Sequence, residues 1–225
     1  DEYASWVRTL DFVEVSDADL DNDTYEAAEK QFSQNNTKQA IATLSNYTVK
    51  FPNGIHSLKA NFYLAQSYYA DNQPNNAIPN YEFVASKARN EFTEQSLVRL
   101  AEIYMKKSDD AKAITTLKRL ETEADFPQNV TFAQSNLMKT YYEQKDYPNA
   151  VVYADKVLAN PKMDDKVKSD AQIIVARSAM NSGDETKAKA AYAKLQSIAK
   201  GELAAEALFY DAYFKNKEGK YEASN

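Results

Sequence analysis

Alanine recurs along the chain at intervals of 37, 36, 37 and 38 residues, and this repeat is the feature that most limits the possible folds. Each repeated alanine follows a short polar segment, such as QPNNA or DYPNA, of a composition typical of turns. Regular periods of roughly 20 to 50 residues are typical of solenoids and other repeat arrays. The five residues are Ala40, Ala77, Ala113, Ala150 and Ala188.

Large side chains keep fixed distances from these alanines. Four residues and seven residues after each alanine stands a mostly apolar residue, such as Leu117 and Leu120 after Ala113. Thirteen residues before the last four alanines stand Leu64, Leu100, Leu137 and Val175. Spacings of three, four and seven place side chains on one face of an α-helix. Each unit is therefore predicted to be two helices joined by a polar turn.

Few residues interrupt this pattern. The 225 residues include only four glycines and six prolines but 33 alanines, so long helices are favoured. No proline falls at the centre of a predicted helix. The predicted helices span 17–34, 38–51, 57–71, 75–89, 93–107, 110–124, 130–144, 148–159, 166–181, 185–199 and 202–217.

The segment FYLAQSYYADNQPNNAIPNYEFV, Phe62–Val84, shows the order Leu-Ala-x2-Tyr, turn, Ala-x3-Tyr. This order resembles the tetratricopeptide repeat, an antiparallel helix pair of about 34 residues. The resemblance implies an all-α, right-handed superhelical solenoid with five full repeats and a partial sixth. The repeats span about 17–54, 55–90, 91–127, 128–163, 164–200 and 201–225.

Both ends of the chain depart from the repeat. We expect residues 1–16 to form a short segment that packs on the first repeat through apolar side chains such as Trp6 and Phe12. The sixth unit ends where its second helix should begin, so we expect the chain to be a fragment of a longer array. Gly219, like Gly183, is predicted to lie in a turn between paired helices.

Composition excludes several chemistries. The chain has no cysteine and one histidine, His56, which removes thiol catalysis and most zinc sites. The net charge of −6 argues against a nucleic-acid partner, and no apolar stretch is long enough to span a membrane. We expect no enzyme activity, no metal and no cofactor.

An acidic stretch near the N-terminus resembles part of a calcium loop. Asp17, Asp19 and Asp21 alternate as in an EF-hand, but Asn22 and Ala28 stand where the loop needs Gly and Glu. A helix N-cap at Ser16 explains the same residues better. The stretch 11–29 carries eight carboxylates and no basic residue, so it is either a solvated end or a docking surface for a basic partner.

A partner-binding groove is the most informative expectation. In the tetratricopeptide family the first helices of the pairs line a concave groove, and the matching positions here are large, aromatic or charged. A core role between neighbouring helices is an equally weighted alternative for each residue. The predicted groove residues are Tyr25, Phe32, Phe62, Gln66, Tyr69, Val98, Glu102, Met105, Lys139, Tyr142, Arg177 and Met180. Glu29, Gln66, Glu102, Lys139 and Arg177 form a polar row that changes from acidic to basic along the chain.

The resemblance implies a non-catalytic scaffold that binds a protein or peptide. The segment FPNGIHSLKANFYLAQSYY resembles periplasmic helper proteins of Gram-negative envelopes, with large tetratricopeptide proteins of Bacteroidetes the most similar. This suggests the periplasm or the outer membrane as its location. A surface glycan-capture protein is the alternative, although the long insertions that carry the sugar site in such proteins are missing. End-to-end self-association through the last unit is a further expectation.

Overall fold

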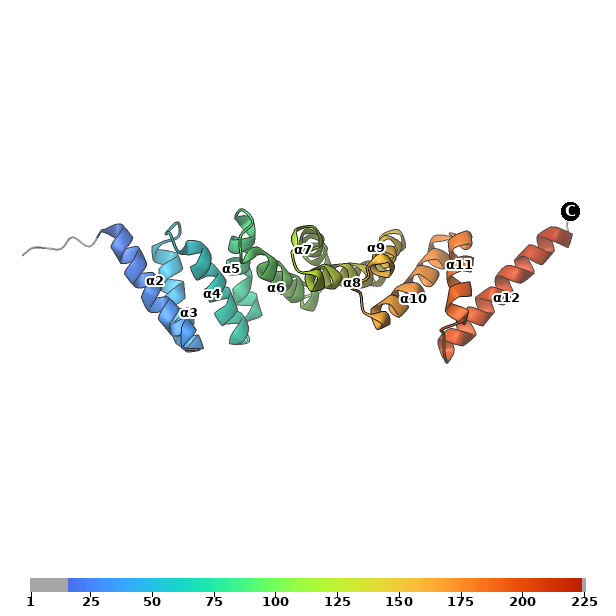
Figure 1. Cartoon of the computed structure of the whole chain (residues 1–225), viewed down its shortest axis with the longest axis horizontal. Helices are drawn as coiled ribbons and strands as arrows, with labels where there is room; N and C mark the ends of the chain where they lie inside the picture. Colours follow the sequence, from blue (N-terminus) through green and yellow to red (C-terminus); the bar gives the residue numbers. More distant parts are fainter. Residues whose placement is uncertain (1–15, 224–225) are drawn as a thin grey trace, which may run out of the picture. The chain divides into compact units, whose positions relative to one another are not determined.

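The computed structural model describes residues 16–223, which form eleven helices and no strand (Figure 1). The predicted N-terminal segment lies outside the described residues, apart from Ser16. The chain divides within α6 into two compact units, Asp1–Ile103 and Tyr104–Asn225. The prediction of an all-α array of paired helices is confirmed.

The first unit contains two helix pairs and most of a fifth helix. Each helix contacts the next along the chain from α2 to α5, and α2 also contacts α4. The helices are α2 (Asp17–Ser33), α3 (Thr37–Lys50), α4 (Ser57–Ala70), α5 (Pro74–Ser86) and α6 (Thr93–Lys106).

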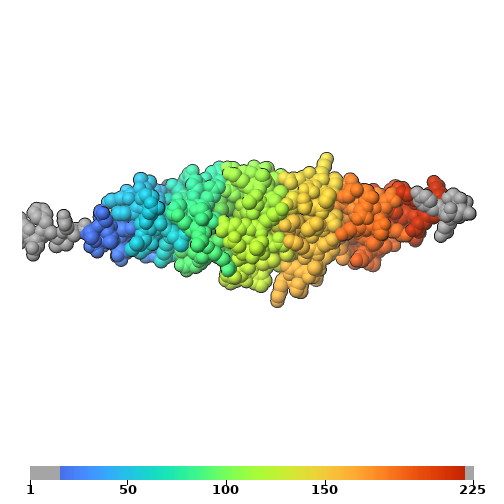
Figure 2. Space-filling model, turned by 90° about the horizontal axis from the view of Figure 1, so that it is seen from above, coloured from blue at the N-terminus to red at the C-terminus, as the bar shows by residue number. Residues whose placement is uncertain are grey.

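The second unit continues the same arrangement. Each helix contacts the next from α7 to α12, and α8 also contacts α10. In each unit, successive colours in Figure 2 form adjacent bands, since each helix pair packs on the following one. The helices are α7 (Asp110–Glu123), α8 (Pro127–Glu143), α9 (Tyr147–Ala159), α10 (Asp165–Ser182), α11 (Glu185–Gln196) and α12 (Glu202–Ala223).

The repeated residues form the core of both units, as predicted. All five repeated alanines are buried, and so are the residues four and seven positions after them. Small alanines let two helix axes approach, and the larger neighbours fill the remaining space between them. The apolar positions thirteen residues before the last four alanines are buried as well. The repeat in the sequence therefore identifies the residues that pack between the helices.

Each turn within a pair contains one residue with left-handed backbone, five residues before the repeated alanine. These residues are Asn35 (φ 57°), Asn72 (φ 58°), Ser108 (φ 54°), Lys145 (φ 61°) and Gly183 (φ 76°). The next amide donates to a carbonyl five residues earlier, as from Asp146 to Tyr141 at 2.9 Å, which satisfies the end of the first helix. In the last three turns an aspartate follows and caps the second helix, as Asp146 does by accepting from the Asn149 amide.

The expected turn at Gly219 is wrong, because α12 continues without a break to Ala223. Most residues after Tyr213 are good helix formers, so one glycine costs only about 1 kcal/mol there. Ion pairs from Lys217 to Glu185 and from Glu218 to Lys189 hold this extension against α11. The turn predicted at Gly183 is confirmed.

Buried polar contacts join α2, α3 and the loop before α4. The Tyr47 hydroxyl donates to Asp21 Oδ1 at 2.5 Å, and the Ile55 amide donates to Asp21 Oδ2 at 3.1 Å. Gly54 lies directly against this pair. Ser16 caps α2 by accepting from the Asp19 amide at 3.1 Å, as predicted. Asp21 therefore serves the packing of the first repeat.

Candidate protein-binding face of the A helices

The predicted groove residues all lie on the first helix of a pair, which we call the A helix; the second is the B helix. In the first unit they lie on α2, α4 and the part of α6 that ends at Ile103. In the second unit they are Met105, near the end of α6, and residues of α8 and α10. A helices contact one another directly within each unit, α2 with α4 and α8 with α10. Side chains on their shared face can thus form a continuous surface inside each unit.

Two of the predicted groove residues belong to the core. Tyr25 is 2 % exposed and Phe62 is 5 % exposed, so neither is accessible to a partner. His56, from the loop after α3, stacks on Tyr25 with ring centroids 4.2 Å apart, and Phe92, from the loop after α5, stacks on Phe62 at 4.5 Å. At these positions the core alternative is correct, because a ring from each connecting loop covers the A helix.

Phe32 lies at the border of the same core. It is half-buried and stacks on Tyr63 of α4, with ring centroids 4.2 Å apart and planes inclined by 11°. The Lys59 ammonium lies over the Tyr63 ring, 5.6 Å from its centroid. It also forms an ion pair with Glu29 at 3.0 Å. This corner of the first unit is therefore built from stacked rings with an ion pair at its edge.

A polar cluster on α4 and α6 brings together three other predicted residues. The Tyr69 hydroxyl donates to Glu102 at 3.3 Å, and Gln66 accepts a hydrogen bond from the Tyr81 hydroxyl. Arg99, which the sequence reasoning missed, binds Glu102 at 2.9 Å and lies over the Tyr69 ring at 4.5 Å. Val98 is half-buried beside it. Arg99 lies three residues before the predicted Glu102, a spacing at which side chains on one helix commonly pair. The sequence therefore did carry a signal for Arg99.

In the second unit, a two-point ion pair on this face joins α10 to α12. Arg177 donates to Glu206 from Nε at 3.0 Å and from a terminal nitrogen at 2.8 Å, and the Tyr192 hydroxyl donates to Glu206 at 2.7 Å. The hydrogen bonds from Arg177 lower the pKa of Glu206, and the same bonds raise the pKa of Arg177. Both groups are therefore charged at neutral pH.

The remaining predicted residues of the second unit are accessible to different degrees. Lys139 is exposed, while Met105, Tyr142 and Met180 are half-buried. Tyr142 packs edge-on against Tyr147 at 6.2 Å, and its hydroxyl contributes to the raised pKa of Arg177. Met180 packs against the buried cluster of α10, α11 and α12. These side chains present aromatic, thioether and cationic groups on successive A helices.

Two further residues extend this face along α12, beyond the last predicted groove residue, Met180. Phe209 and Tyr213 follow Ile173 and Arg177 by 36 residues, so they occupy the matching positions of the last A helix. They are 64 % and 41 % exposed. The repeat period itself carries their signal in the sequence. We call Lys139, Tyr142, Arg177, Met180, Phe209 and Tyr213 the A face of unit 2.

The expected charge gradient along the polar row is largely cancelled. Glu29, Glu102 and Arg177 are each neutralised by a neighbour of opposite charge. Lys139 has no ion-pair partner among residues 16–223. A pattern of single residues cannot show this, because the partners Lys59 and Glu206 lie 29 or 30 residues away in the sequence.

Neither metal-binding clusters nor membrane-spanning segments occur in the described part of the chain. Among residues 16–223, no three metal-ligating side chains gather at one point. Over the same residues, no helix has the length and apolar character needed to cross a bilayer.

The comparisons with known proteins agree with this architecture. A family model described as a tetratricopeptide repeat-like domain matches residues 13–131, so the chain belongs to this family. No curated protein matches the sequence.

The solved structures to which this chain is similar share little sequence with it. A tetratricopeptide repeat protein from Parabacteroides merdae aligns at 16 % identity and a TM-score of 0.53, covering 90 % of this chain and 78 % of that one. Pseudomonas aeruginosa PilF aligns at 17 % identity and a TM-score of 0.47, covering 93 % and 100 %. A putative kinesin light chain from Podosopora anserina aligns at 17 % identity and a TM-score of 0.45, covering 87 % and 96 %.

Proposed function

We propose that this chain is a non-catalytic scaffold that binds a segment of another protein on the A face of unit 2. The tetratricopeptide fold supports protein binding in general. The observation that carries the specific proposal is the series of accessible side chains on α8, α10 and α12.

The chemistry of the A face of unit 2 suits a protein partner. Tyrosine and arginine dominate the energetically important positions of protein interfaces, and methionine adapts its shape to a partner. Phe209 and Tyr213 add apolar surface that is open to solvent. Exposed apolar side chains grouped on one face of a soluble protein usually mark an interaction site.

The test is a peptide-display screen with the whole chain as bait, followed by fluorescence anisotropy with the selected peptides. Tyr142→Ala and Phe209→Ala should each weaken binding by about 1 kcal/mol or more, and leave the circular dichroism unchanged. Val152→Ala is the matched control, since Val152 is exposed on the B helix α9. Equal losses in all three variants, or none in the first two, would refute the proposal. Selection of glycans instead of peptides from a parallel array would support the alternative, a glycan-capture protein.

We also propose a location in the bacterial cell envelope. The support is the resemblance of residues 51–69 to repeats of periplasmic helper proteins. Cell fractionation with an antibody against the chain tests it, and recovery in the cytosol alone would contradict it.

Self-association through α12 is a separate proposal. Leu208 is exposed beside Phe209 and Tyr213, so this helix carries apolar surface that a second copy could cover. Light scattering should show a mass that rises with concentration, and Leu208→Ser should abolish the rise. A constant monomer mass for the unmodified chain would exclude it.

A further inference from the structure

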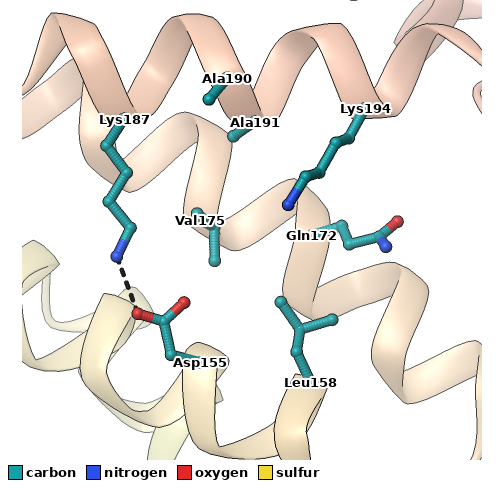
Figure 3. A pocket seen from close by; sticks show the side chains of 8 residues that line it. All are labelled: Asp155, Leu158, Gln172, Val175, Lys187, Ala190, Ala191 and Lys194. Carbon is teal, nitrogen blue, oxygen red and sulfur yellow. Dashed lines mark hydrogen bonds and ion pairs between the residues drawn. The ribbon is translucent and has the colours of Figure 1, made fainter.

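A cavity of about 130 Å³ opens between α9, α10 and α11 in the second unit (Figure 3). It faces another side of α10 from Arg177 and Met180, because its α10 residues are Gln172 and Val175. Its lining comes from one A helix and from the B helices on either side of it. The site is thus separate from the A face of unit 2.

The cavity has an apolar interior and a charged rim. Leu158 of α9, Val175 of α10, and Ala190 and Ala191 of α11 supply the apolar groups. Because ligand pockets for small molecules usually enclose roughly 300 Å³ or more, this space suits a single aliphatic side chain better than a whole small molecule. Ala190 and Ala191 contribute only methyl groups to this lining (Figure 3).

The two lysines at the rim are not equivalent. Lys187 is neutralised by Asp155, with 2.8 Å between Nζ and Oδ2. Lys194 reaches over the opposite part of the opening, near Gln172 (Figure 3). It has no ion-pair partner among residues 16–223. The rim therefore carries one uncompensated positive charge in a chain whose net charge is −6. A carboxylate beside the inserted side chain would complement it.

We propose that this cavity is a second peptide site, which takes an aliphatic side chain followed by an aspartate or glutamate. The aliphatic group enters between Leu158, Val175 and Ala190, and the carboxylate binds Lys194, with the Gln172 amide as a further donor. The side chain supplies buried apolar area, and the ion pair orients the segment.

The test uses three blocked hexapeptides that carry fluorescein: Ser-Gly-Leu-Asp-Gly-Ser and the versions with Leu-Lys and Gly-Asp at its centre. The whole chain should bind the Leu-Asp peptide with saturation below about 1 mM, and the other two at least about fivefold more weakly. No saturation with the Leu-Asp peptide, or equal binding of all three, would overturn the proposal.

Variants of the cavity sharpen the test. Lys194→Gln should weaken binding of the Leu-Asp peptide about fivefold, and Lys194→Glu should reverse the preference toward the Leu-Lys peptide. Ala190→Leu should close the entrance and reduce binding about tenfold or more. The matched controls are Lys166→Gln and Ala193→Leu, exposed positions on α10 and α11 that do not line the cavity. Both controls should bind the Leu-Asp peptide normally. A loss in Lys166→Gln equal to that in Lys194→Gln, or a loss in Ala193→Leu equal to that in Ala190→Leu, would contradict the proposed site.

This test also separates the cavity from the A face of unit 2. Phe209→Ala should leave binding of the Leu-Asp peptide unchanged, because Phe209 lies on α12, outside the cavity. A loss confined to Phe209→Ala would refute the cavity site and support the A face as the place where this peptide binds. Normal binding by Phe209→Ala together with loss in Ala190→Leu would support the cavity and leave the A face to its own test.

Discussion

Arg177 of α10 and Glu206 of α12 form a two-point ion pair that holds two successive A helices together. Glu206 also accepts from Tyr192 of the intervening B helix, so three helices meet at one carboxylate. Through these contacts, the Glu206 carboxylate connects Arg177 at the surface of the repeat to Tyr192 in its core.

Replacing Glu206 by glutamine should make stability less sensitive to acid. The pKa of Glu206 lies below its ordinary value of 4.5 because Arg177 donates to it. The unfolded chain therefore binds this proton first, and the stabilisation is present above pH 4.5 and disappears as the pH falls through the lower folded pKa. We expect Glu206→Gln to lower the free energy of unfolding by about 1 kcal/mol at pH 7, and by much less in acid. Urea titrations at several pH values measure the difference.

Glu143→Gln is the control for this experiment. Glu143 is exposed on α8 and forms no ion pair within the described residues. A pH-independent difference between wild type and Glu206→Gln would show that Arg177 contributes packing and not charge.

Enlarging a repeated alanine should destabilise the second unit. Ala113 of α7 is fully buried. The added methyl groups of Ala113→Leu have no space, so we expect a loss of about 1–3 kcal/mol in chemical denaturation. Ala111→Leu, two residues earlier and exposed, should change stability by less than about 0.5 kcal/mol. Equal stability of the two variants would mean that the repeat register is wrong.

Two glycines should respond in opposite directions to alanine. Gly183 has φ 76° and nothing within 4 Å of an added Cβ, so Gly183→Ala should cost about 1 kcal/mol through the backbone alone. Gly219 lies inside α12 with equally open space, so Gly219→Ala should stabilise the helix by up to about 1 kcal/mol. Thermal unfolding followed by circular dichroism distinguishes them. A loss in Gly219→Ala would indicate that the helix does not extend that far in solution.

The close approach of Gly54 to Asp21 and Tyr47 should make this position intolerant of any side chain. A Cβ there would lie 2.6 Å from the Tyr47 hydroxyl oxygen, 2.9 Å from Phe51 Cβ, and within contact of the Asp21 carboxylate. Gly54→Ala should therefore break the hydrogen bond between Tyr47 and Asp21 and cost about 2 kcal/mol. Asn53→Ala, next to it and exposed, serves as the control. Unchanged stability of Gly54→Ala would show that the loop moves away freely.

The helices and their order could be predicted because the repeat contains the packing contacts themselves. The buried positions of Ala113, Leu117 and Leu120 have a buried counterpart in each of the five helix pairs, and one face of a helix suffices to identify them. The end of α12 was misjudged, since a glycine in a helix costs little once Lys217 and Glu218 form ion pairs with α11. Such contacts join residues about 30 positions apart and have no local signal.

The candidate site was predictable only in part for the same reason. Periodicity identifies the helix face of Tyr25 and Phe62, but not the rings of His56 and Phe92 that cover it. It likewise identifies Arg177 without showing that Glu206 neutralises it. The left-handed turn residues were also missed, because asparagine, serine and lysine occupy four of the five positions where glycine would have been the usual signal.

The constant turn within each pair determines where this chain can change its length during evolution. From the left-handed residue to the repeated alanine the distance is always five, whereas the interval between successive alanines varies from 36 to 38. One residue inserted between Lys145 and Ala150 would rotate α9 by about 100° relative to α8 and turn Val157 out of the core. One residue inserted after Pro161, in the exposed part of the connection between α9 and α10, would only lengthen that connection. Insertions and deletions among descendants of this sequence should therefore collect in the loops that join one pair to the next.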